Sequence, residues 1–556
     1  MGEPAGGQTD FKTPLDMFSH WEATIPDQVW LRQALRGSWT DLTWAQAGEQ
    51  CRRVAAALQR QGLEAGDKVG ILAANSPHWV MADIACMMAG MVVVPVYTTM
   101  PMDKVRYVVE HSDMRALFVG SSVDPGALRR ELPATLSLFS LPGTDSPAMD
   151  VSWEGIVASG PIMEGSPRRD PDEMWTIIYT SGTTGMPKGV MHSYATLPHS
   201  GRAIPQFTGS DSHSRLFSYL PLAHAAERVL VELHSLYSGA SIGFNECKES
   251  FTADLREVRP TFFLAVPRIW TNLKAGIIGQ LGDDAWQQLM DNPQAGAEIG
   301  KAVLTAMGLD AVTYAFSGAA PISPADIQAW RALGMPLYEG FGQSEIMSGT
   351  ANIAGHDRVG SVGKTLDGGG SEVKISEIGE ILLRAPGAML GYYKDPEKTA
   401  ETIVDGWVRT GDKGRIDDDG FVHITGRVKE IFKTAKGKYV APAPIENRFA
   451  AGPHVDQLCL VGSGLPQTVM LVNLPQGSLA LDREQVSGDL ERQRCAVNEC
   501  LEAHERISHV VVCSQPWTLE NRLLTHTLKI LRDDVEKYHR LTIERCLAGN
   551  ETVVWE

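Results

Sequence analysis

Cysteine is scarce in this chain, and its few cysteines form no recognisable pattern. Eight occur in 556 residues, with neither a C-x-x-C pair nor a Cys/His spacing typical of a metal site. Disulfide-stabilised domains have a much higher cysteine density. The N-terminus also lacks the basic and apolar regions of a signal peptide. We therefore expect reduced, mostly buried thiols in a cytoplasmic protein.

Long hydrophobic runs are also missing. The longest uncharged run, residues 84–102, reaches spanning length but contains Gly90, Pro95 and Pro101. This pattern favours a buried helix end followed by a strand and a turn, so we expect no transmembrane segment. Peripheral contact with a membrane requires only a small surface patch and stays open.

An excess of basic residues is absent. Lys and Arg number 50 against 67 Asp and Glu, which gives a formal net charge of −17, whereas nucleic acids select for basic faces. We expect no nucleic-acid partner, but an anionic small-molecule substrate needs only a local basic site. The hydrophobic fraction of 43% is typical of a globular protein, and the length predicts roughly two to four domains. The sequence does not fix whether the chain forms a homo-oligomer.

Short apolar strands alternate with helices in the first part of the chain. Thr43 and Gln46 form a capping box, and Ser76 followed by Pro77 is typical of a helix start. Alternation of this kind is typical of βαβ units and a largely parallel sheet. The Pro-, Gly- and Ser-rich segment 141–172 is predicted to be a loop. Strands are predicted at residues 69–73, 91–96, 116–120 and 175–179.

The pattern changes after about residue 360, and we predict a domain boundary near residue 428. The predicted fold class is α/β: a large N-terminal domain (1–428) of layered βαβ sheets with a small β-barrel-like portion, and a smaller, mobile α+β C-terminal domain (429–556). Short strands are predicted at residues 380–384, 413–416, 421–425, 457–461 and 468–472, and helices near 482–506 and 529–548.

A glycine- and hydroxyl-rich segment, YTSGTTGMPKG at residues 179–189, follows a predicted strand directly. Glycines let backbone amides converge on an anion, hydroxyls add donors and Lys188 adds charge, so the segment predicts a phosphate-binding loop. It is not a Walker A motif, which requires Gly-Lys followed by Ser or Thr. Residues 239–243 fit G-x-S-x-G without the required strand–turn–helix order, and residues 417–420 indicate a hairpin turn rather than an EF-hand loop.

The segment 179–189 resembles the phosphate-binding loop of the adenylate-forming enzymes, which include acyl-CoA synthetases, luciferases and peptide-synthetase adenylation domains. The similarity extends over roughly residues 40–545. Matching segments are LPLAH at 220–224, FSGAAP at 316–321, YEGFGQSE at 338–345, WVRTGD at 407–412, GRVK at 426–429 and THTLK at 525–529. Three further segments resemble the long-chain fatty acyl-CoA synthetase branch: PLAHAAER at 221–228, residues 254–268 and YVAPAPIE at 439–446.

This resemblance implies three catalytic residues. Lys529 is expected to bridge the substrate carboxylate and the α-phosphate of ATP, where two anions must meet. Glu345 is expected to bind Mg²⁺ together with the hydroxyl of Thr183, since magnesium favours a few protein oxygens plus phosphates. His224 resembles the residue that closes over the carboxylate. Taken alone, these residues would be an ordinary surface lysine, a solvated glutamate and a core histidine, so their roles rest on the resemblance.

The nucleotide site implied by the resemblance is spread over several of these segments. Asp412 is expected to accept both ribose hydroxyls, and Phe341, flanked by two glycines, to stack on adenine. The chain departs from the family at Gln343 and Ser344, where an apolar residue and threonine are frequent, and a modest effect is expected because Ser344 keeps the hydroxyl. The predicted ATP/AMP set comprises Thr180, Ser181, Gly182, Thr183, Thr184, Gly185, Lys188, Ser317, Gly318, Glu339, Gly340, Phe341, Ser344, Asp412 and Arg427.

A basic island, RVKEIFKTAKGK at residues 427–438, has five cations and one glutamate in a strongly acidic chain. Such runs are usually solvated, but this one begins at the predicted boundary and resembles the family's hinge and coenzyme A segment. The resemblance implies that the C-terminal domain rotates about Lys429, so that Lys529 serves only the first of two reaction steps. The implied hinge or coenzyme A residues are Lys429, Lys433, Lys436 and Gly437.

The predicted function is ATP-dependent ligation of a carboxylic acid, best matched by a medium- or long-chain fatty acid, to coenzyme A. Acyl-AMP and pyrophosphate form first, and the thiol of coenzyme A then displaces AMP. Alternatives are an acyl-AMP ligase that delivers to a carrier protein, a ligase for an aromatic or other non-fatty acid, and a non-catalytic ligand-binding relative. The acyl pocket is expected among apolar residues of 224–350, where Arg228 occupies the position of a bulky gate in some relatives, so chain length stays undetermined.

Overall fold

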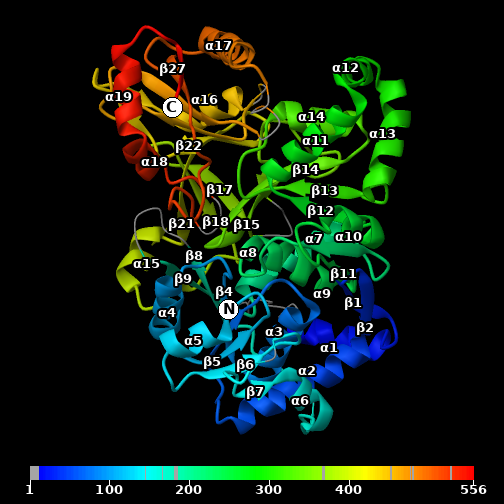
Figure 1. Ribbon diagram of the computed structural model, residues 1–556. Helices are drawn as coiled ribbons and strands as arrows, with labels where there is room; N and C mark the ends of the chain where they lie inside the picture. Colours follow the sequence, from blue (N-terminus) through cyan, green and yellow to red (C-terminus); the bar gives the residue numbers. More distant parts are fainter. Residues whose placement is uncertain are drawn as a thin grey trace, which may run out of the picture.

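The computed structural model describes residues 12–556 apart from 145, 166, 181–185, 366–369, 451, 453, 476–477, 479–480 and 526–528, and it leaves the side chains of 283 and 293–297 undescribed. Figure 1 shows a large N-terminal domain, coloured blue to yellow, and a smaller C-terminal domain, coloured orange to red, that lies against one end of it. The predicted α/β class is confirmed.

An eight-stranded sheet occupies the lower part of the N-terminal domain in Figure 1. Its order is β19-β9-β8-β4-β3-β5-β6-β7, parallel from β8 to β7, with β9 and β19 antiparallel at one edge. The predicted parallel sheet is therefore confirmed. Its strands are β3 (Lys68–Leu72), β4 (Val92–Val96), β5 (Met114–Val119), β6 (Ser137–Ser140), β7 (Val151–Ser152), β8 (Met174–Thr180), β9 (Lys188–Ser193) and β19 (Gly391–Tyr392).

A second sheet has nine strands in the order β16-β15-β14-β13-β12-β10-β11-β1-β2. It is parallel from β14 to β1 and antiparallel at both edges. Its strands are β1 (Val29–Leu35), β2 (Ser38–Thr43), β10 (Arg215–Ser218), β11 (Ser241–Phe244), β12 (Phe262–Ala265), β13 (Tyr314–Ser317), β14 (Leu337–Gln343), β15 (Ile346–Ala351) and β16 (Lys364–Thr365).

Helix starts in the N-terminal domain follow the capping signals in the sequence. The capping box of Thr43 and Gln46 opens α2, and the Ser76 hydroxyl accepts from the Trp79 N–H at the start of α3. Helix α3 is buried on nearly every side and contacts strands of both large sheets, so it forms part of the shared core. The helices are α1 (Pro14–Thr24), α2 (Trp44–Arg60), α3 (Pro77–Ala89), α4 (Met102–His111), α5 (Pro125–Glu131), α6 (Trp153–Ser159), α7 (Thr196–Thr208), α8 (Ala225–Glu227), the π-helix η1 (Arg228–Leu233), α9 (His234–Ser238), α10 (Phe251–Val258), α11 (Pro267–Leu281), α12 (Asp283–Asp291), α13 (Pro293–Met307), α14 (Pro324–Ala332) and α15 (Pro396–Thr402).

A small antiparallel sheet completes the N-terminal domain, and a mixed sheet forms the core of the C-terminal domain. The small sheet contains β17 (Glu372–Ile375), β18 (Glu380–Arg384), β20 (Ile403–Val404), β21 (Trp407–Ile416) and β22 (Val422–Arg427). The C-terminal domain contains β23 (Phe432–Lys433), β24 (Tyr439–Val440), β25 (Gln457–Val461), β26 (Thr468–Asn473), β27 (Ile507–Val512), β28 (Val553–Trp555), α16 (Pro442–Phe449), α17 (Arg483–Glu499), α18 (Arg532–Tyr538) and α19 (Arg540–Ala548). The predicted helix at 529–548 is thus interrupted at His539.

The prediction of a loop over 141–172 is wrong in part. Residues 151–152 pair with β6, and α6 follows directly. The Ser152 hydroxyl accepts from the Gly155 N–H (3.1 Å), while Trp153 and Ile156 are buried one turn apart. The abundance of Pro, Gly and Ser around this helix concealed its N-cap and its short apolar face.

The two motif matches dismissed on the sequence have the expected structures. Gly239 ends α9 with φ +78° and is followed by β11, so residues 239–243 form a helix–turn–strand unit rather than a nucleophile elbow. Residues 417–420 form the hairpin turn between β21 and β22, closed by a hydrogen bond of 2.9 Å from the Gly420 N–H to the Asp417 carbonyl.

The uncharged run 84–102 is distributed over α3, β4 and the turn after it. Within the described part of the chain, no helix combines the length and apolar character needed to cross a bilayer.

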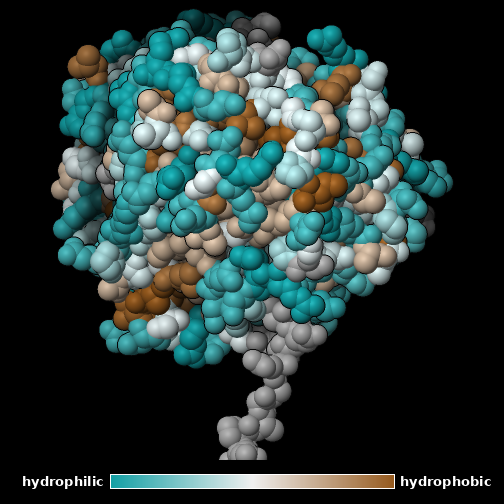
Figure 2. All heavy atoms as spheres, turned by 90° about the horizontal axis from the view of Figure 1, so that it is seen from below, coloured by the Kyte–Doolittle hydropathy of each residue, from teal (hydrophilic) through white to brown (hydrophobic). Residues whose placement is uncertain are grey.

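On the face of the N-terminal domain seen in Figure 2, hydrophilic side chains are interspersed with scattered hydrophobic groups. All eight cysteines are free thiols; five are buried and three are exposed.

Candidate active site

The turn between β14 and β15, residues 343–345, lies where the three sheets of the N-terminal domain meet. Side chains from two other sheets reach it: Asp412 from β21, His192 from β9 and Tyr392 from β19. This convergence brings together sequence segments that are far apart in the chain. It contains two of the predicted site residues, Ser344 and Glu345.

Asp412 is buried and oriented by two polar side chains. Its Oδ1 lies 3.0 Å from Nε of Arg427, the residue directly opposite on β22, and its Oδ2 accepts from Nε2 of Gln343 at 2.5 Å. Burial raises the pKa of the Asp412 carboxyl, and the Arg427 charge and the Gln343 hydrogen bond oppose that rise. Binding of a ribose diol at Asp412 stays a prediction, and it would require exchange of one of these partners.

Glu345 and Lys188 bring opposite charges to the same place. The Tyr392 hydroxyl donates to Oε1 of Glu345 (2.7 Å), and the Lys188 ammonium lies 5.5 Å from the centre of the Tyr392 ring. The pKa of Lys188 is lowered, first by burial and then by the charges of Lys398 and Lys429, while Glu345 opposes this. A single half-buried carboxylate with a lysine nearby fits a divalent cation that takes most of its ligands from phosphates and water.

The C-terminal domain brings Lys529 to this site. Although the residue keeps a solvent-exposed surface, loss of hydration lowers the pKa of its ammonium, Arg427 lowers it further, and carboxylates that include Asp412 and Glu345 oppose the shift. Its N–H donates to the Thr525 hydroxyl (3.0 Å), and its carbonyl accepts from the Thr525 N–H (2.8 Å). A cation of the C-terminal domain thus lies within electrostatic reach of two predicted site carboxylates of the N-terminal domain.

Strand β13 ends in a buried hydroxyl. Ser317 Oγ has no hydrogen-bond partner among the described residues; leaving a buried donor unpaired is costly, and the carboxyl ends of parallel strands are where such sheets bind ligands. On the next strand, a Cβ at Gly340 would lie 2.3 Å from the Phe316 ring and 2.9 Å from the Thr350 carbonyl. Only glycine fits there, next to Ser317 and Gly318.

Two other residues predicted to bind the nucleotide have partners inside the protein. Glu339 accepts from the Ile322 N–H (3.2 Å), and burial raises its pKa to about 8. Phe341 is half-buried and packs against the apolar cluster of the small antiparallel sheet. Their contacts with adenine stay predictions.

His224 lies at the N-cap of α8, where its Nδ1 accepts from the Ala226 N–H at 3.1 Å. The segment around it is therefore a helix start, with the imidazole turned toward its own backbone. Closure of His224 over a carboxylate stays a prediction and would require the ring to leave this cap.

Arg228, one turn after His224, is fully buried in an ion network. Its Nε lies 3.1 Å from Glu232, its Nη1 donates to Thr176 Oγ1 (2.8 Å) and its Nη2 pairs with Asp83. The guanidinium also lies 4.3 Å from the centre of the Trp175 ring. Because every arm of the side chain is held, Arg228 has a fixed orientation and is not free to move as a gate.

The ends of β8 and β9 enclose the predicted phosphate loop. Thr180 lies opposite Lys188 in the antiparallel register, so the loop closes a hairpin. The remaining loop residues of the prediction lie outside the described residues, and with them the proposed metal role of Thr183: Ser181, Gly182, Thr183, Thr184 and Gly185.

The basic island forms a turn and a short hairpin. Lys429 is exposed in the turn directly after β22. Lys433 on β23 has its ammonium 5.5 Å from the centre of the Tyr439 ring, and Lys436 and Gly437 (φ +77°) are exposed in the turn between β23 and β24. The island is therefore solvent-facing, as a coenzyme A surface would be, and its roles stay predictions.

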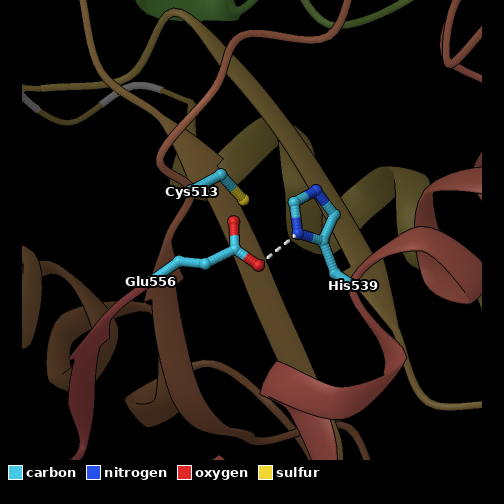
Figure 3. A group of neighbouring side chains, drawn as sticks. All are labelled: Cys513, His539 and Glu556. Carbon is cyan, nitrogen blue, oxygen red and sulfur yellow. Dashed lines mark hydrogen bonds and ion pairs between the residues drawn. The ribbon is translucent and has the colours of Figure 1, made fainter. Parts of the chain in front are cut away.

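A second group of potential metal ligands lies in the C-terminal domain: Cys513, His539 and Glu556 (Figure 3). His539 Nδ1 lies 2.9 Å from Glu556, and Nε2 lies 3.0 Å from the indole nitrogen of Trp517. Because an indole N–H can only donate, Nε2 accepts and Nδ1 carries the proton that faces Glu556. Both ring nitrogens already have hydrogen-bond partners. We therefore interpret His539 as the centre of a hydrogen-bonded cluster with Trp517 and Glu556, not as a metal ligand.

Three contacting side chains of the site were missed on the sequence: Gln343, Tyr392 and His192. On the sequence, Gln343 stands out only as a departure from the family pattern. Tyr392 contacts a residue 47 positions away, and no local pattern reports such a pair. The sequence does contain a signal for His192. Alternate residues of a strand lie on the same face, so His192 is expected on the same face as Lys188.

The comparisons with known proteins agree with this geometry. Residues 18–393 match the family model of the AMP-binding enzymes, and residues 429–551 match the C-terminal domain model of the same enzymes. The chain belongs to the AMP-binding enzyme family.

Named relatives and solved structures cover nearly the whole chain. The chain is 30% identical to a long-chain-fatty-acid–CoA ligase, FadD15, of Mycobacterium bovis, covering 95% of this chain and 96% of that protein. It is 29% identical to fatty acyl-CoA synthetase A of Dictyostelium discoideum, with 93% and 87% covered. The fold is similar to that of the anthranilate CoA ligase AuaEII in complex with anthranoyl-AMP, with a TM-score of 0.80, 21% identity and 96% and 98% covered.

Proposed function

We propose that this protein is an ATP-dependent acid–CoA ligase that joins a fatty acid to coenzyme A through acyl-AMP. The observation that carries the proposal is the position of Lys529, which extends from the C-terminal domain toward Glu345 and Asp412 of the N-terminal domain. A ligand-binding relative without catalysis would have no need for a cation held at that junction.

The first step must overcome repulsion between two anions. A carboxylate oxygen attacks the α-phosphorus of ATP, a bond forms between them, and the bond from that phosphorus to the pyrophosphate oxygen breaks. Lys529 and Lys188 supply positive charge where this negative charge gathers, and fixed cations are effective because they need no rearrangement during the reaction. Partial loss of hydration, which lowers the pKa of both ammonium groups, makes their effect stronger than it would be in bulk water.

Glu345 would hold Mg²⁺, together with Thr183. The ion would supply neutralisation of the phosphate oxygens. The fit rests on chemistry present at the site: Tyr392 occupies Oε1 of Glu345, and no hydrogen-bond or ion-pair partner of Oε2 is found within the described chain.

The nucleotide would lie between β13, β14 and β21. The unpaired Ser317 hydroxyl would be available to a nucleotide, and glycine at position 340 lets the Phe316 ring and the Thr350 carbonyl pack directly against the backbone of β14. The buried Asp412 would accept the ribose hydroxyls, and Arg427 would keep that carboxylate ionised.

The second step requires a different domain arrangement. We place the division of the chain at 1–428 and 429–556, with rotation about Lys429, because Lys429 lies exposed in the turn directly after the last strand of the N-terminal domain. Rotation would withdraw Lys529 and bring the basic hairpin that contains Lys433, Lys436 and Gly437 toward the acyl-AMP, where the coenzyme A thiol displaces AMP.

A fatty acid is the favoured substrate because relatives that match nearly the whole chain are named as a long-chain-fatty-acid–CoA ligase and a fatty acyl-CoA synthetase. The test is a coupled assay of pyrophosphate and AMP release across aliphatic acids of increasing length and aromatic acids, with and without coenzyme A. Acyl-CoA formation that is greatest with aliphatic acids supports the proposal. Three other outcomes would contradict the proposal and indicate a different function. They are a preference for aromatic acids, transfer only to a carrier protein, and no pyrophosphate release from any acid.

A further inference from the structure

One face of strand β9 contacts the segment that carries Glu345. Alternate residues of a strand lie on the same face, and on this strand they are Lys188, Val190 and His192. Lys188 lies over the Tyr392 ring, Val190 forms a buried apolar cluster with Met389 and Tyr392, and His192 reaches the carbonyl of Ser344. The strand that starts at the phosphate loop is thus tied along its length to the predicted metal ligand.

The proton positions on His192 follow from its partners. Nε2 lies 2.7 Å from the Ser344 carbonyl, which can only accept, so Nε2 carries the hydrogen. Nδ1 lies 3.0 Å from the Thr196 hydroxyl, whose oxygen already accepts from the Ser193 N–H (2.9 Å). The hydroxyl therefore donates to Nδ1. The ring is fully buried and has a partner on each nitrogen, so it has a single orientation.

Glu345 is held from three directions. His192 fixes the carbonyl of the preceding residue, the Met389 N–H donates to the carbonyl of Glu345 itself (2.8 Å), and the Tyr392 hydroxyl donates to Oε1 of its carboxylate (2.7 Å). These contacts fix the backbone on both sides of Glu345 and one of its two carboxylate oxygens. Because the backbone and Oε1 are held, the direction of the second carboxylate oxygen, Oε2, is fixed as well.

We propose that His192 is a positioning residue, which acts with Tyr392 to aim the second carboxylate oxygen of Glu345 at the divalent cation of the bound ATP. The inference rests on the proposed function for the identity of that cation. It explains why a buried histidine lies four residues after the phosphate-loop lysine: the same strand sets the distance between the phosphate site and the metal ligand.

The test uses variants that separate hydrogen bonding from packing. His192→Leu removes the donor, whereas His192→Gln offers an amide N–H in the region of Nε2. Tyr392→Phe removes the other hydrogen bond to Glu345. Ser200→Ala is the matched control, because it deletes a buried hydrogen bond of 2.6 Å to Ser348 on β15, the strand that follows Glu345, without touching Glu345.

Binding of Mn²⁺ in the presence of ATP is measured by the loss of the free-ion signal in electron paramagnetic resonance. Loss of residues that orient a metal ligand typically weakens metal affinity about 10- to 100-fold. We expect a weakening of this size for His192→Leu and Tyr392→Phe, substantial recovery for His192→Gln, and no change for Ser200→Ala. The Mg²⁺ concentration at half-maximal pyrophosphate release should shift in parallel.

A double substitution distinguishes positioning from a general structural effect. In a Glu345→Ala background, His192→Leu should weaken Mn²⁺ binding no further, and an additional loss there would overturn the proposal. Equal binding by wild type and His192→Leu would also overturn it. If His192→Leu does not fold, Tyr392→Phe decides: equal Mn²⁺ binding by wild type and Tyr392→Phe would overturn the proposal.

The metal measurement is independent of the acyl acceptor. Wild-type protein that binds Mn²⁺ with ATP but forms no acyl-CoA contradicts the proposed function alone. Wild-type protein that makes acyl-CoA, with Mn²⁺ binding unaffected in the variants, contradicts the role of His192 alone.

Discussion

Arg268 and Asp456 form an ion pair that joins the two domains. Nη2 of Arg268, on α11, lies 2.9 and 3.0 Å from the two carboxylate oxygens of Asp456, which precedes β25. The pair is partly exposed to solvent. Together with the approach of Lys529 to Asp412, it defines the arrangement of the domains in this structure.

Asp456→Asn should favour other domain arrangements. An exposed ion pair contributes about 0.2–1 kcal/mol, so the ratio of thioester formation to adenylation should rise by no more than about fivefold. The two half-reactions are measured separately on one preparation. Asp310→Asn is the control, because it breaks the Arg259–Asp310 pair (2.6 Å) within the N-terminal domain. An equal change in both variants would mean that the interdomain pair has no special role.

Lys529→Ala should abolish most acyl-AMP formation, with a loss of about 10²–10³-fold, because a fixed charge contact of the transition state is removed. Thioester formation from supplied acyl-AMP should be largely spared. Lys537→Ala, an exposed lysine of α18, is the control and should leave both steps unchanged. Equal loss of both half-reactions in Lys529→Ala would contradict the alternation of domains.

Lys429→Pro tests the hinge. A hydrogen bond of 3.3 Å from the Glu430 N–H to the Arg427 carbonyl closes a turn with Lys429 in its third position. Proline there restricts the preceding residue and opposes this turn. We expect the adenylation step to fall more than the thioester step, measured by the pyrophosphate burst and by acyl-CoA turnover.

Ile378→Pro is the matched control for the hinge. It places proline in the third position of the turn 376–379, closed by a hydrogen bond of 2.9 Å, inside the N-terminal domain. That change should lower the melting temperature and affect both steps together. A parallel loss of both steps in Lys429→Pro would argue against a pivot at this residue.

Glu339→Gln should stabilise the protein increasingly as pH rises. Burial raises the pKa of Glu339 to about 8, above its ordinary value of 4.5. A group with a raised pKa contributes stability that is fully present below the ordinary pKa and is lost as pH rises through the folded-state pKa. The variant keeps an oxygen for the Ile322 N–H and does not titrate, so its advantage should grow between pH 4.5 and 8 toward a limit of about 5 kcal/mol, at ~1.4 kcal/mol per pKa unit.

Chemical unfolding at several pH values measures this effect. Asp41→Asn is the control, because Asp41 forms a partly exposed pair with Arg32 at the edge of a sheet. A constant difference in stability between wild type and Glu339→Gln across that pH range would show that Glu339 is ionised in the folded protein.

The hydrogen-bonded cluster of His539, Trp517 and Glu556 is expected to stabilise the C-terminal domain without binding a metal. His539→Leu leaves the Trp517 indole N–H without its acceptor, and a buried unpaired donor costs about 1–3 kcal/mol. We expect a lower melting temperature for this variant, and an unchanged melting temperature of the wild type on addition of Zn²⁺ or a chelator. Stabilisation of the wild type by Zn²⁺, lost in His539→Leu, would instead identify a metal centre.

Local patterns predicted most strands and the best-defined helix starts, because side-chain periodicity and capping are properties of neighbouring residues. Ser76 and Thr43 are examples: each makes the cap that the sequence indicated. Helix α6 was missed because its composition resembles a loop, although Ser152 carries the same kind of cap.

The candidate site was predictable only in part. Glu345, Asp412 and Lys529 were identified through motifs, and the structure brings their charges together. The contact between Gln343 and Asp412 spans 69 residues and depends on how two sheets meet. No local sequence pattern reports how two sheets pack against each other, so contacts of this kind are identified only from the three-dimensional structure.

The buried charges around Arg228 restrict how this protein can change over evolutionary time. Removing one partner of a buried ion pair costs about 3–5 kcal/mol, against a total stability of about 5–15 kcal/mol for a typical domain. Replacing Arg228 would leave the buried carboxylates of Asp83 and Glu232 without the cation that they share. Replacement of Arg228 should therefore be accompanied by replacement of Asp83 and Glu232, and descendants that keep Arg228 should keep an ion-pair partner for it.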